Sequence, residues 1–243
     1  MDEIILGLSL SAIVVFLLRF IFGWSSYRRS IHKVIYSCYL EYYSKKKRIR
    51  KLSESAALEE DFGKHKVLYQ FFSNNGAKLP KPYIIVILSS GIYCLKVSNT
   101  PGEIYGANTG NWESIVSYDK KHPDKRMKEK MVNPIIELEQ FSKKLQEKII
   151  KIKTPVYKIV VFPDKSTLKT KDEEIGNAYV IRRSQLHDTL INIHKSKEMI
   201  LCDWEIDALW EMMAGDSLKL EENKVLLNKK KQEIENYMPN NNI

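Results

Sequence analysis

The chain has 243 residues, of which 44% are hydrophobic and 28% charged, a composition typical of a folded protein with its own core. Glycine and proline are sparse, with 10 and 8 residues, which excludes collagen-like and low-complexity chains. Three widely spaced cysteines, Cys38, Cys94 and Cys202, form no zinc or redox motif and fit a reducing compartment. The sequence therefore predicts one sizeable domain with short appendages.

The first element is an apolar stretch from Ile4 to Trp24, which only Arg19 interrupts. As a helix it is roughly 30 Å long, the thickness of the hydrocarbon core of a bilayer. Arg19 lies near one end, where its long stem can reach the interface. Asp2 and Glu3 precede the stretch, whereas a signal peptide needs basic residues there. We therefore expect a retained transmembrane anchor.

Positive charge gathers directly after this stretch. Of the net charge of +9, residues 1–26 carry −1, residues 27–51 carry +8, and residues 52–243 carry the remaining +2. We call the following residues the basic cluster: Arg28, Arg29, Lys45, Lys46, Lys47, Arg48, Arg50 and Lys51. By the positive-inside rule, they predict a single-pass, bacterial-type cell-membrane protein whose bulk is cytoplasmic and whose cluster attracts anionic lipid head groups. Because residues 52–243 are close to neutral, the charge of the domain supports nucleic acid as a partner only weakly.

Apolar residues between Ile31 and Tyr43 recur at three- and four-residue spacing, which predicts one face of a helix. This face either packs on its own domain or contacts the membrane or another subunit. The residues that we expect at a protein interface, here and near the C-terminus, are Ile31, Ile35, Tyr39, Tyr42, Trp204 and Trp210.

The next elements are a predicted helix over Ala56 to Phe72, ended by a turn at residues 73–76, and a β-hairpin over Tyr83 to Val97. The hairpin consists of an apolar run, a Ser-Ser-Gly turn at residues 89–91, and a second apolar run. Because its first strand is apolar at nearly every position, we expect both faces to be buried in a layered α/β domain.

Downstream, Tyr118 to Lys130 reads as a polar surface loop, and Asn133-Pro134 as the start of a helix. Strands are predicted over Val156 to Phe162 and Ala178 to Ile181, followed by a helix from Ser184. Residues 203–238 are predicted to form two helices that either cover the sheet or bind a partner.

Several short motifs follow one another in order within the stretch from Leu58 to Ile193. They are Gly91-Ile92-Tyr93-Cys94-Leu95, Asn99, Gly102, Ile104, Gly106, Trp112, Asn133-Pro134 and Val160-Val161-Phe162-Pro163. This order resembles the nuclease-related domain, a family of the restriction-endonuclease-like superfamily. The resemblance implies a mixed sheet flanked by helices, preceded here by one transmembrane helix. The expected units are residues 1–26 (anchor), 27–55 (basic juxtamembrane helix), 56–197 (nuclease-related-like domain) and 198–243 (helical extension).

The resemblance also implies where a catalytic site would lie. In that family an Asp at the start of the first hairpin strand and Glu-x-Lys on the second hold a divalent cation and orient the attacking water. The matching positions here are Tyr83, Lys96 and Ser98, and Glu137 stands where the following helix has Gln. Because Lys96 would repel a divalent ion, the resemblance implies an inactive site, with no metal and no cofactor.

Three hypotheses follow. The first is a membrane-anchored binding or scaffold subunit with an inactive nuclease-related domain. The second is an active Mg-dependent nuclease with relocated carboxylates, drawn from Glu103, Glu137, Glu60 and Asp61. The third is a purely structural subunit of a membrane complex. The sequence contains no Gly-rich phosphate loop and no Ser-His-Asp signature that would favour another enzyme class.

Overall fold

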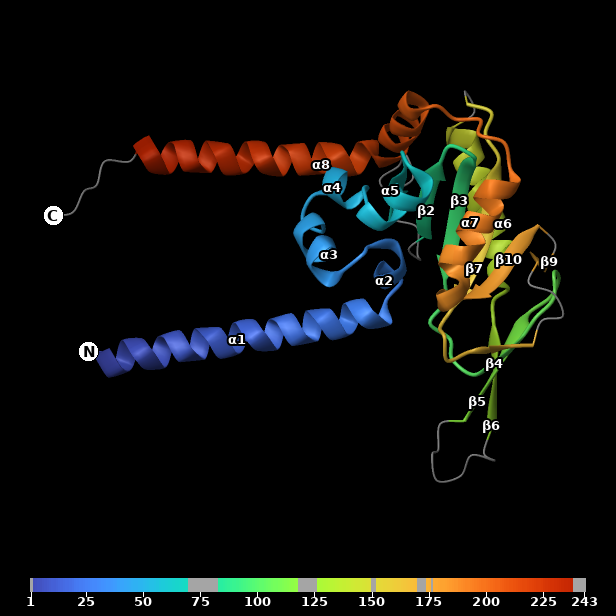
Figure 1. The fold of residues 1–243 in the computed structure, drawn as a ribbon, viewed down its shortest axis with the longest axis horizontal. Helices are drawn as coiled ribbons and strands as arrows, with labels where there is room; N and C mark the ends of the chain where they lie inside the picture. Colours follow the sequence, from blue (N-terminus) through green and yellow to red (C-terminus); the bar gives the residue numbers. More distant parts are fainter. Residues whose placement is uncertain are drawn as a thin grey trace.

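The computed structural model describes residues 2–69, 83–117, 126–149, 152–169, 174–175 and 177–237. Two mixed sheets are flanked by helices, and one long apolar helix stands at the N-terminus (Figure 1). The predicted α/β class is therefore confirmed. The predicted helix end and turn at residues 70–76 lie outside the described residues, as does the start of the predicted loop after Ser117.

The helices are α1 (Asp2–Arg29), α2 (His32–Ile35), α3 (Tyr39–Lys45), α4 (Ile49–Leu52), α5 (Ala56–Phe62), α6 (Pro134–Lys148), α7 (Leu186–Ser196) and α8 (Asp203–Tyr237), with a 3-10 turn η1 (Arg183–Gln185). The larger sheet runs in the order β1 (Lys66–Leu68), β2 (Tyr83–Leu88), β3 (Gly91–Val97), β7 (Val156–Phe162), β10 (Ala178–Arg182) and β9 (Glu174–Ile175). The smaller sheet runs β6 (Arg126–Met131), β5 (Trp112–Ser117), β4 (Glu103–Tyr105) and β8 (Thr167–Leu168).

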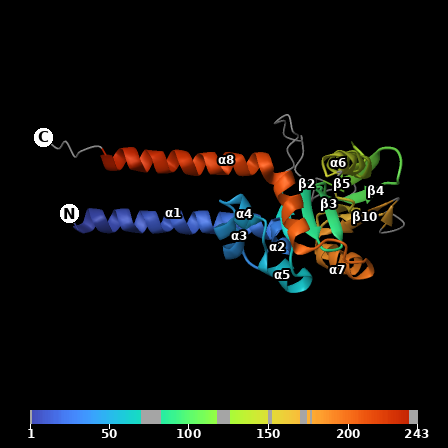
Figure 2. The ribbon, with the colours of Figure 1, turned by 90° about the horizontal axis from the view of Figure 1, so that it is seen from above.

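The hairpin β2–β3 lies in the middle of the larger sheet. All six residues of β2 are buried, as the apolar run predicts. Strands β3, β7 and β10 are parallel to one another, so their carboxyl ends meet at one edge. Figure 2 shows α6 and α7 on opposite sides of these strands. Side chains of α6 and α8 pack in the core on one face, and those of α7, α5 and α2 pack on the other.

The motif residues after the hairpin hold the two sheets together. Trp112 is fully buried, its ring lies parallel to that of Phe162, and its Nε1 donates to the carbonyl of Ala107 at 2.9 Å. Asn133 donates to the same carbonyl at 3.3 Å and caps α6 by accepting from the backbone N–H of Ile135. These bonds fix where α6 starts, and therefore which of its residues face the hairpin.

Two predicted elements, a helix and a loop, have wrong boundaries because part of each predicted range forms a β-strand. The helix predicted over Ala56 to Phe72 ends at Phe62, because Gly63 adopts a positive φ of 66°. Residues 66–68 then form β1, an edge strand antiparallel to β2. Part of the predicted polar loop, Arg126–Met131, is strand β6, whose charged residues are exposed beside β5.

Two helical predictions also need correction. The face predicted over Ile31 to Tyr43 is divided into α2 and α3, because the backbone is extended at Tyr36 and Cys38. The two helices predicted after residue 203 are one continuous helix, α8.

Helix α1 has the features of a candidate membrane span. Its stretch Gly7–Arg29 contains an 18-residue window with a mean hydropathy of 1.9, and the rest of the described chain buries none of that window. Tyr27, near the end of the stretch, is buried against the domain. In both views α1 and the outer part of α8 extend from the domain in the same direction (Figures 1 and 2). All described side chains of α8 from Glu222 to Lys230 are exposed, and one of them, Lys224, lines a cavity described below.

The close approach of Gly106 to Trp112 generates a test of the fold. A Cβ added at Gly106 would lie 2.1 Å from the Trp112 ring. We expect Gly106→Ala to lower the free energy of unfolding by about 2 kcal/mol or more, because a fully packed ring has no room to move. Thermal unfolding of the full chain in detergent measures this loss. The control is Gly215→Ala in α8, where nothing lies within 4 Å. That change should be neutral or stabilise by up to about 1 kcal/mol, and equal effects of the two substitutions would contradict the packing argument.

Candidate functional site

The position where the resemblance implies a metal site lies at one end of the hairpin, between β3 and α6. Tyr83 and Lys96 are direct partners across the two strands. Lys96 is only 6% exposed, and its ammonium forms an ion pair with the carboxylate of Glu137 on α6. The structure therefore brings together three of the four residues that the alignment assigned to the site.

Aromatic rings complete the surroundings of this ion pair. The Lys96 ammonium lies 5.4 Å from the centre of the Tyr83 ring, within the range of a cation–π contact. The other face of that ring stacks on Phe141 of α6 at 4.1 Å. Burial and the neighbouring Glu137 carboxylate raise the pKa of Tyr83 to about 12, so its phenol stays neutral at physiological pH. The position of the family's first carboxylate thus holds a neutral ring.

Ser98, the fourth aligned residue, lies apart from the ion pair. It follows the end of β3, where its backbone N–H donates to Val161 at 2.8 Å and its hydroxyl contacts that of Thr100 at 3.1 Å. Ser98 lines a cavity with Asn99 and Val161, described below. The predicted Glu-x-Lys positions are therefore occupied by a buried cation and by a hydroxyl that lines a cavity.

The alternative carboxylates lie on separate elements. Glu137 pairs with Lys96, whereas Glu103 is in the smaller sheet with Arg126 at 3.5 Å. Asp61 pairs with His187 of α7 at 2.9 Å, and Glu60 is exposed on α5. Helices α5 and α7 cover the sheet face opposite α6. Among the described residues, no three His, Cys, Asp or Glu side chains form a group that could hold a metal ion.

The basic cluster is divided between structural contacts and surface charges. Arg28 stacks on Trp24 at 4.8 Å, Lys45 pairs with Glu41 at 3.0 Å, and Arg50 pairs with Glu211 of α8 at 2.9 Å. These contacts join the juxtamembrane segment to itself and to α8. Lys47, Arg48 and Lys51 remain exposed or half-buried at the surface. Part of the predicted lipid-facing charge is therefore used to hold the segment in place.

The residues expected at a protein interface are mostly inside the chain. Ile31, Ile35, Tyr39 and Trp210 are buried by the chain's own core, and Trp204 is 68% exposed. A contact surface for another subunit can therefore include Trp204, but not the buried residues without rearrangement.

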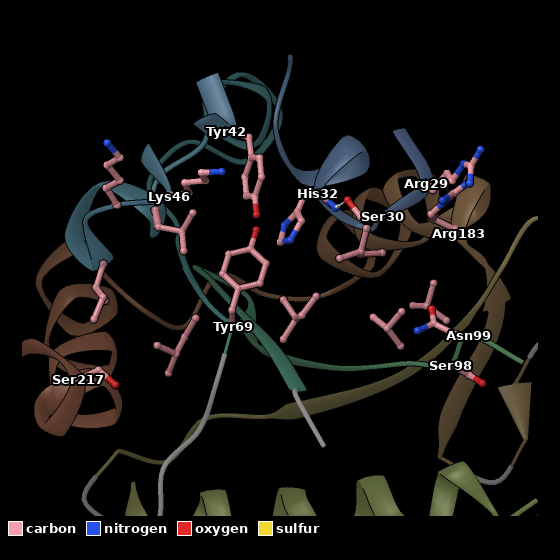
Figure 3. A pocket seen from close by; sticks show the side chains of 18 of the residues that line it. Arg29, Ser30, His32, Tyr42, Lys46, Tyr69, Ser98, Asn99, Arg183 and Ser217 are labelled. Carbon is pink, nitrogen blue, oxygen red and sulfur yellow. Dashed lines mark hydrogen bonds between the residues drawn. The ribbon is translucent and has the colours of Figure 1, made fainter. Parts of the chain in front are cut away.

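A cavity of about 960 Å³ lies beside this site, and no motif in the sequence predicts it. It is bounded by the end of α1, by α3, by the ends of β3 and β7, and by α8 (Figure 3). Its lining comes from segments that are far apart along the chain, so no local sequence motif predicts it. The only early signal was the basic cluster, three residues of which line it: Arg29, Lys46 and Lys47.

Comparison with known proteins gives one match. Residues 45–163 match the family model of the nuclease-related domain. The matched range begins at the last residue of α3 and ends directly after β7, so it contains the hairpin, Lys96, α6 and Glu137. No curated protein and no solved structure matches this chain.

The ion pair between Lys96 and Glu137 generates a test of the site. We expect Lys96→Met to destabilise the chain by about 3 kcal/mol, because it leaves a partly buried carboxylate without its cation. The double variant Lys96→Met with Glu137→Leu should recover most of this loss, because neither charge is then buried. Chemical unfolding of the full chain in detergent measures both values. A single variant as stable as the native chain would show that the pair does not hold α6 to the hairpin.

Proposed function

We propose, from the match of residues 45–163 to the nuclease-related domain family, that this chain is a membrane-anchored member whose catalytic position has lost its metal ion. The domain then acts as a binding or scaffold subunit. The observation that carries the proposal is the buried Lys96 ammonium, which lies between the Glu137 carboxylate and the Tyr83 ring.

The chemistry of the position supports this role. A divalent cation needs several oxygen ligands, usually with two or more carboxylates, to replace its water shell. Of the aligned residues, only Glu137 supplies a carboxylate, and it already balances a lysine charge. A magnesium ion at this place would have to approach an ammonium group in a buried setting, where repulsion between like charges is strong. Without the metal, the chain lacks the group that would activate water for phosphodiester cleavage.

A metal titration tests this proposal. We expect the full chain in detergent to show no Mg²⁺- or Mn²⁺-dependent cleavage of single- or double-stranded DNA or RNA, and no Mn²⁺ binding by calorimetry. Lys96→Glu should gain Mn²⁺ binding, because it places a second carboxylate beside Glu137. Lys96→Gln is the matched control, because it removes the same positive charge beside Glu137 without adding a carboxylate, and it should gain no Mn²⁺ binding. Metal-dependent cleavage by the native chain, abolished by Glu137→Gln, would instead establish the nuclease with relocated carboxylates.

We also propose that α1 crosses the cell membrane with the rest of the chain on the cytoplasmic side. The apolar stretch Gly7–Arg29 and the basic residues that follow it support this orientation. The outer part of α8 carries Lys229-Lys230-Lys231 and cannot share the hydrocarbon with α1. The described side chains of residues 225–230 are exposed and lie outside the cavity lining, so the part of α8 after Lys224 can turn away from the membrane with little loss of contact.

Thiol labelling tests the orientation. Cys38 and Cys202 are exposed in the structure, so their reaction with a thiol reagent that cannot cross membranes shows on which side of the membrane they lie. In intact cells we expect neither thiol to react, and both to react once the membrane is permeabilised. Asp2→Cys, at the opposite end of α1, should react in intact cells and serves as the control. Labelling of Cys202 in intact cells would reverse the proposed orientation.

A further inference from the structure

The cavity beside the catalytic position has the size and location of a ligand site. Its volume of about 960 Å³ lies at the upper end of the range found for small-molecule sites, roughly 300 to 1,000 Å³. It opens at the carboxyl ends of the parallel strands β3 and β7, where sheets of this kind commonly bind ligands. Its position is therefore that of a binding site formed by the fold, not of a gap between surface loops.

The floor of the cavity is apolar. Ile84, Val97 and Val161 line it from the sheet, Leu68 from β1, and Leu220 from α8. Apolar surface of this extent is unfavourable in contact with water, so the floor favours an occupant with an apolar body.

The side of the cavity near α1 and α3 is cationic. Arg29, Lys46 and Lys47 line it, and Lys224 lines the cavity from α8. Figure 3 shows Arg29 and Lys46 on different sides of the rings of His32, Tyr42 and Tyr69. Within the part of the chain that the structure describes, no carboxylate pairs with Arg29, Lys47 or Lys224. The carboxylate in the lining, Glu221, accepts from the backbone N–H of Ile49 at 3.0 Å. The cavity therefore presents an excess of positive charge to an anionic group.

Aromatic rings form one wall of the cavity. The His32 ring stacks on Tyr42 at 4.3 Å and lies 4.8 Å from Tyr69, and the three rings form one wall (Figure 3). Burial lowers the pKa of His32 to about 4, so the ring is neutral and can donate or accept a hydrogen bond. These rings bound the cavity with flat, largely apolar faces, which suit the apolar part of an occupant.

We propose that this cavity binds one anionic phospholipid of the inner leaflet. The phosphate lies beside Lys46 and Lys47, and part of the apolar body covers the floor between the sheet and α8. A lipid fits better than a soluble phosphate because Arg29 and Ser30, at the cytoplasmic end of the candidate span, line the cavity themselves. The inference rests on the proposed membrane anchoring, and it adds a site on the opposite side of β3 from Lys96.

Lipid retention by the full chain tests the site. The chain is reconstituted in nanodiscs of phosphatidylcholine and phosphatidylglycerol in equal parts, extracted into detergent, and examined by native mass spectrometry. We expect one retained phosphatidylglycerol per chain. Lys46→Gln with Lys47→Gln should weaken retention roughly tenfold or more, because two charge-assisted contacts are lost. Arg48→Gln with Lys51→Gln removes the same charge from neighbouring residues that do not line the cavity and should retain the lipid.

A second pair of variants tests the floor independently of charge. Ser217 lines the cavity from α8, whereas its neighbour Asp216 is exposed and outside the lining. We expect Ser217→Trp to expel the lipid by filling the space, and Asp216→Trp to retain it. Circular dichroism and thermal unfolding confirm that both variants fold.

The outcomes separate the inference from the membrane proposal. If Lys46→Gln with Lys47→Gln and Arg48→Gln with Lys51→Gln lost the same amount of retained lipid, the binding would depend on general surface charge. That result would overturn the proposed site. Displacement of the lipid by AMP or glycerol phosphate, with binding of AMP in lipid-free detergent, would show that the occupant is a soluble organic phosphate. Failure of the native chain to enter nanodiscs at all would contradict the anchor itself, whereas entry without a retained lipid contradicts only the cavity assignment.

Discussion

A buried ammonium must have a counter-charge, and this constraint links the central hairpin to α6. Lys96 lies on a strand that is otherwise apolar and faces the helix that carries Glu137. An unpaired lysine at 6% exposure would lose most of its hydration, so the chain must bring a carboxylate to it. Asn133 and Trp112 fix the start of α6 and thereby place Glu137 one turn into the helix, opposite the strand.

The same strand end has two different environments. Lys96 faces the ion pair and the aromatic rings beside α6, whereas Val97 and Ser98 line the cavity beside α1, α3 and α8. Alternation along a β-strand explains why Lys96 and Val97 face opposite sides of the sheet. One side of the strand end therefore forms a closed electrostatic contact, and the other lines the cavity.

The juxtamembrane segment joins the anchor to the domain through charge as well as packing. Glu41 accepts hydrogen bonds from Ser37, Lys45 and the backbone N–H of Ala56, so it ties α3 to the start of α5. Arg50 reaches α8 through Glu211. A basic segment that composition alone assigns to the lipid surface therefore also has a structural role. Of its other charges, Arg29, Lys46 and Lys47 line the cavity, whereas Arg48 and Lys51 do not.

The sequence by itself determined the elements whose signals are local. The apolar run of β2, the Asn-Pro start of α6, the strand β7 and the apolar α1 depend on neighbouring residues, and all four are present where the pattern predicted them. The family could also be recognised, because glycines and Trp112 are required at contacts that the fold cannot vary, as the 2.1 Å approach at Gly106 shows.

Only the tertiary structure decided which polar residues meet. Lys96 and Glu137 are far apart in the sequence, so their ion pair could not be predicted from it. Alignment with the family showed that a lysine occupies an unexpected position, but not which carboxylate pairs with it. Strands β1 and β6 were missed because an edge strand is specified by its neighbour rather than by its own apolarity. The cavity draws on α1, α3, two strand ends and α8, and such a site exists only when long-range packing has brought those segments together.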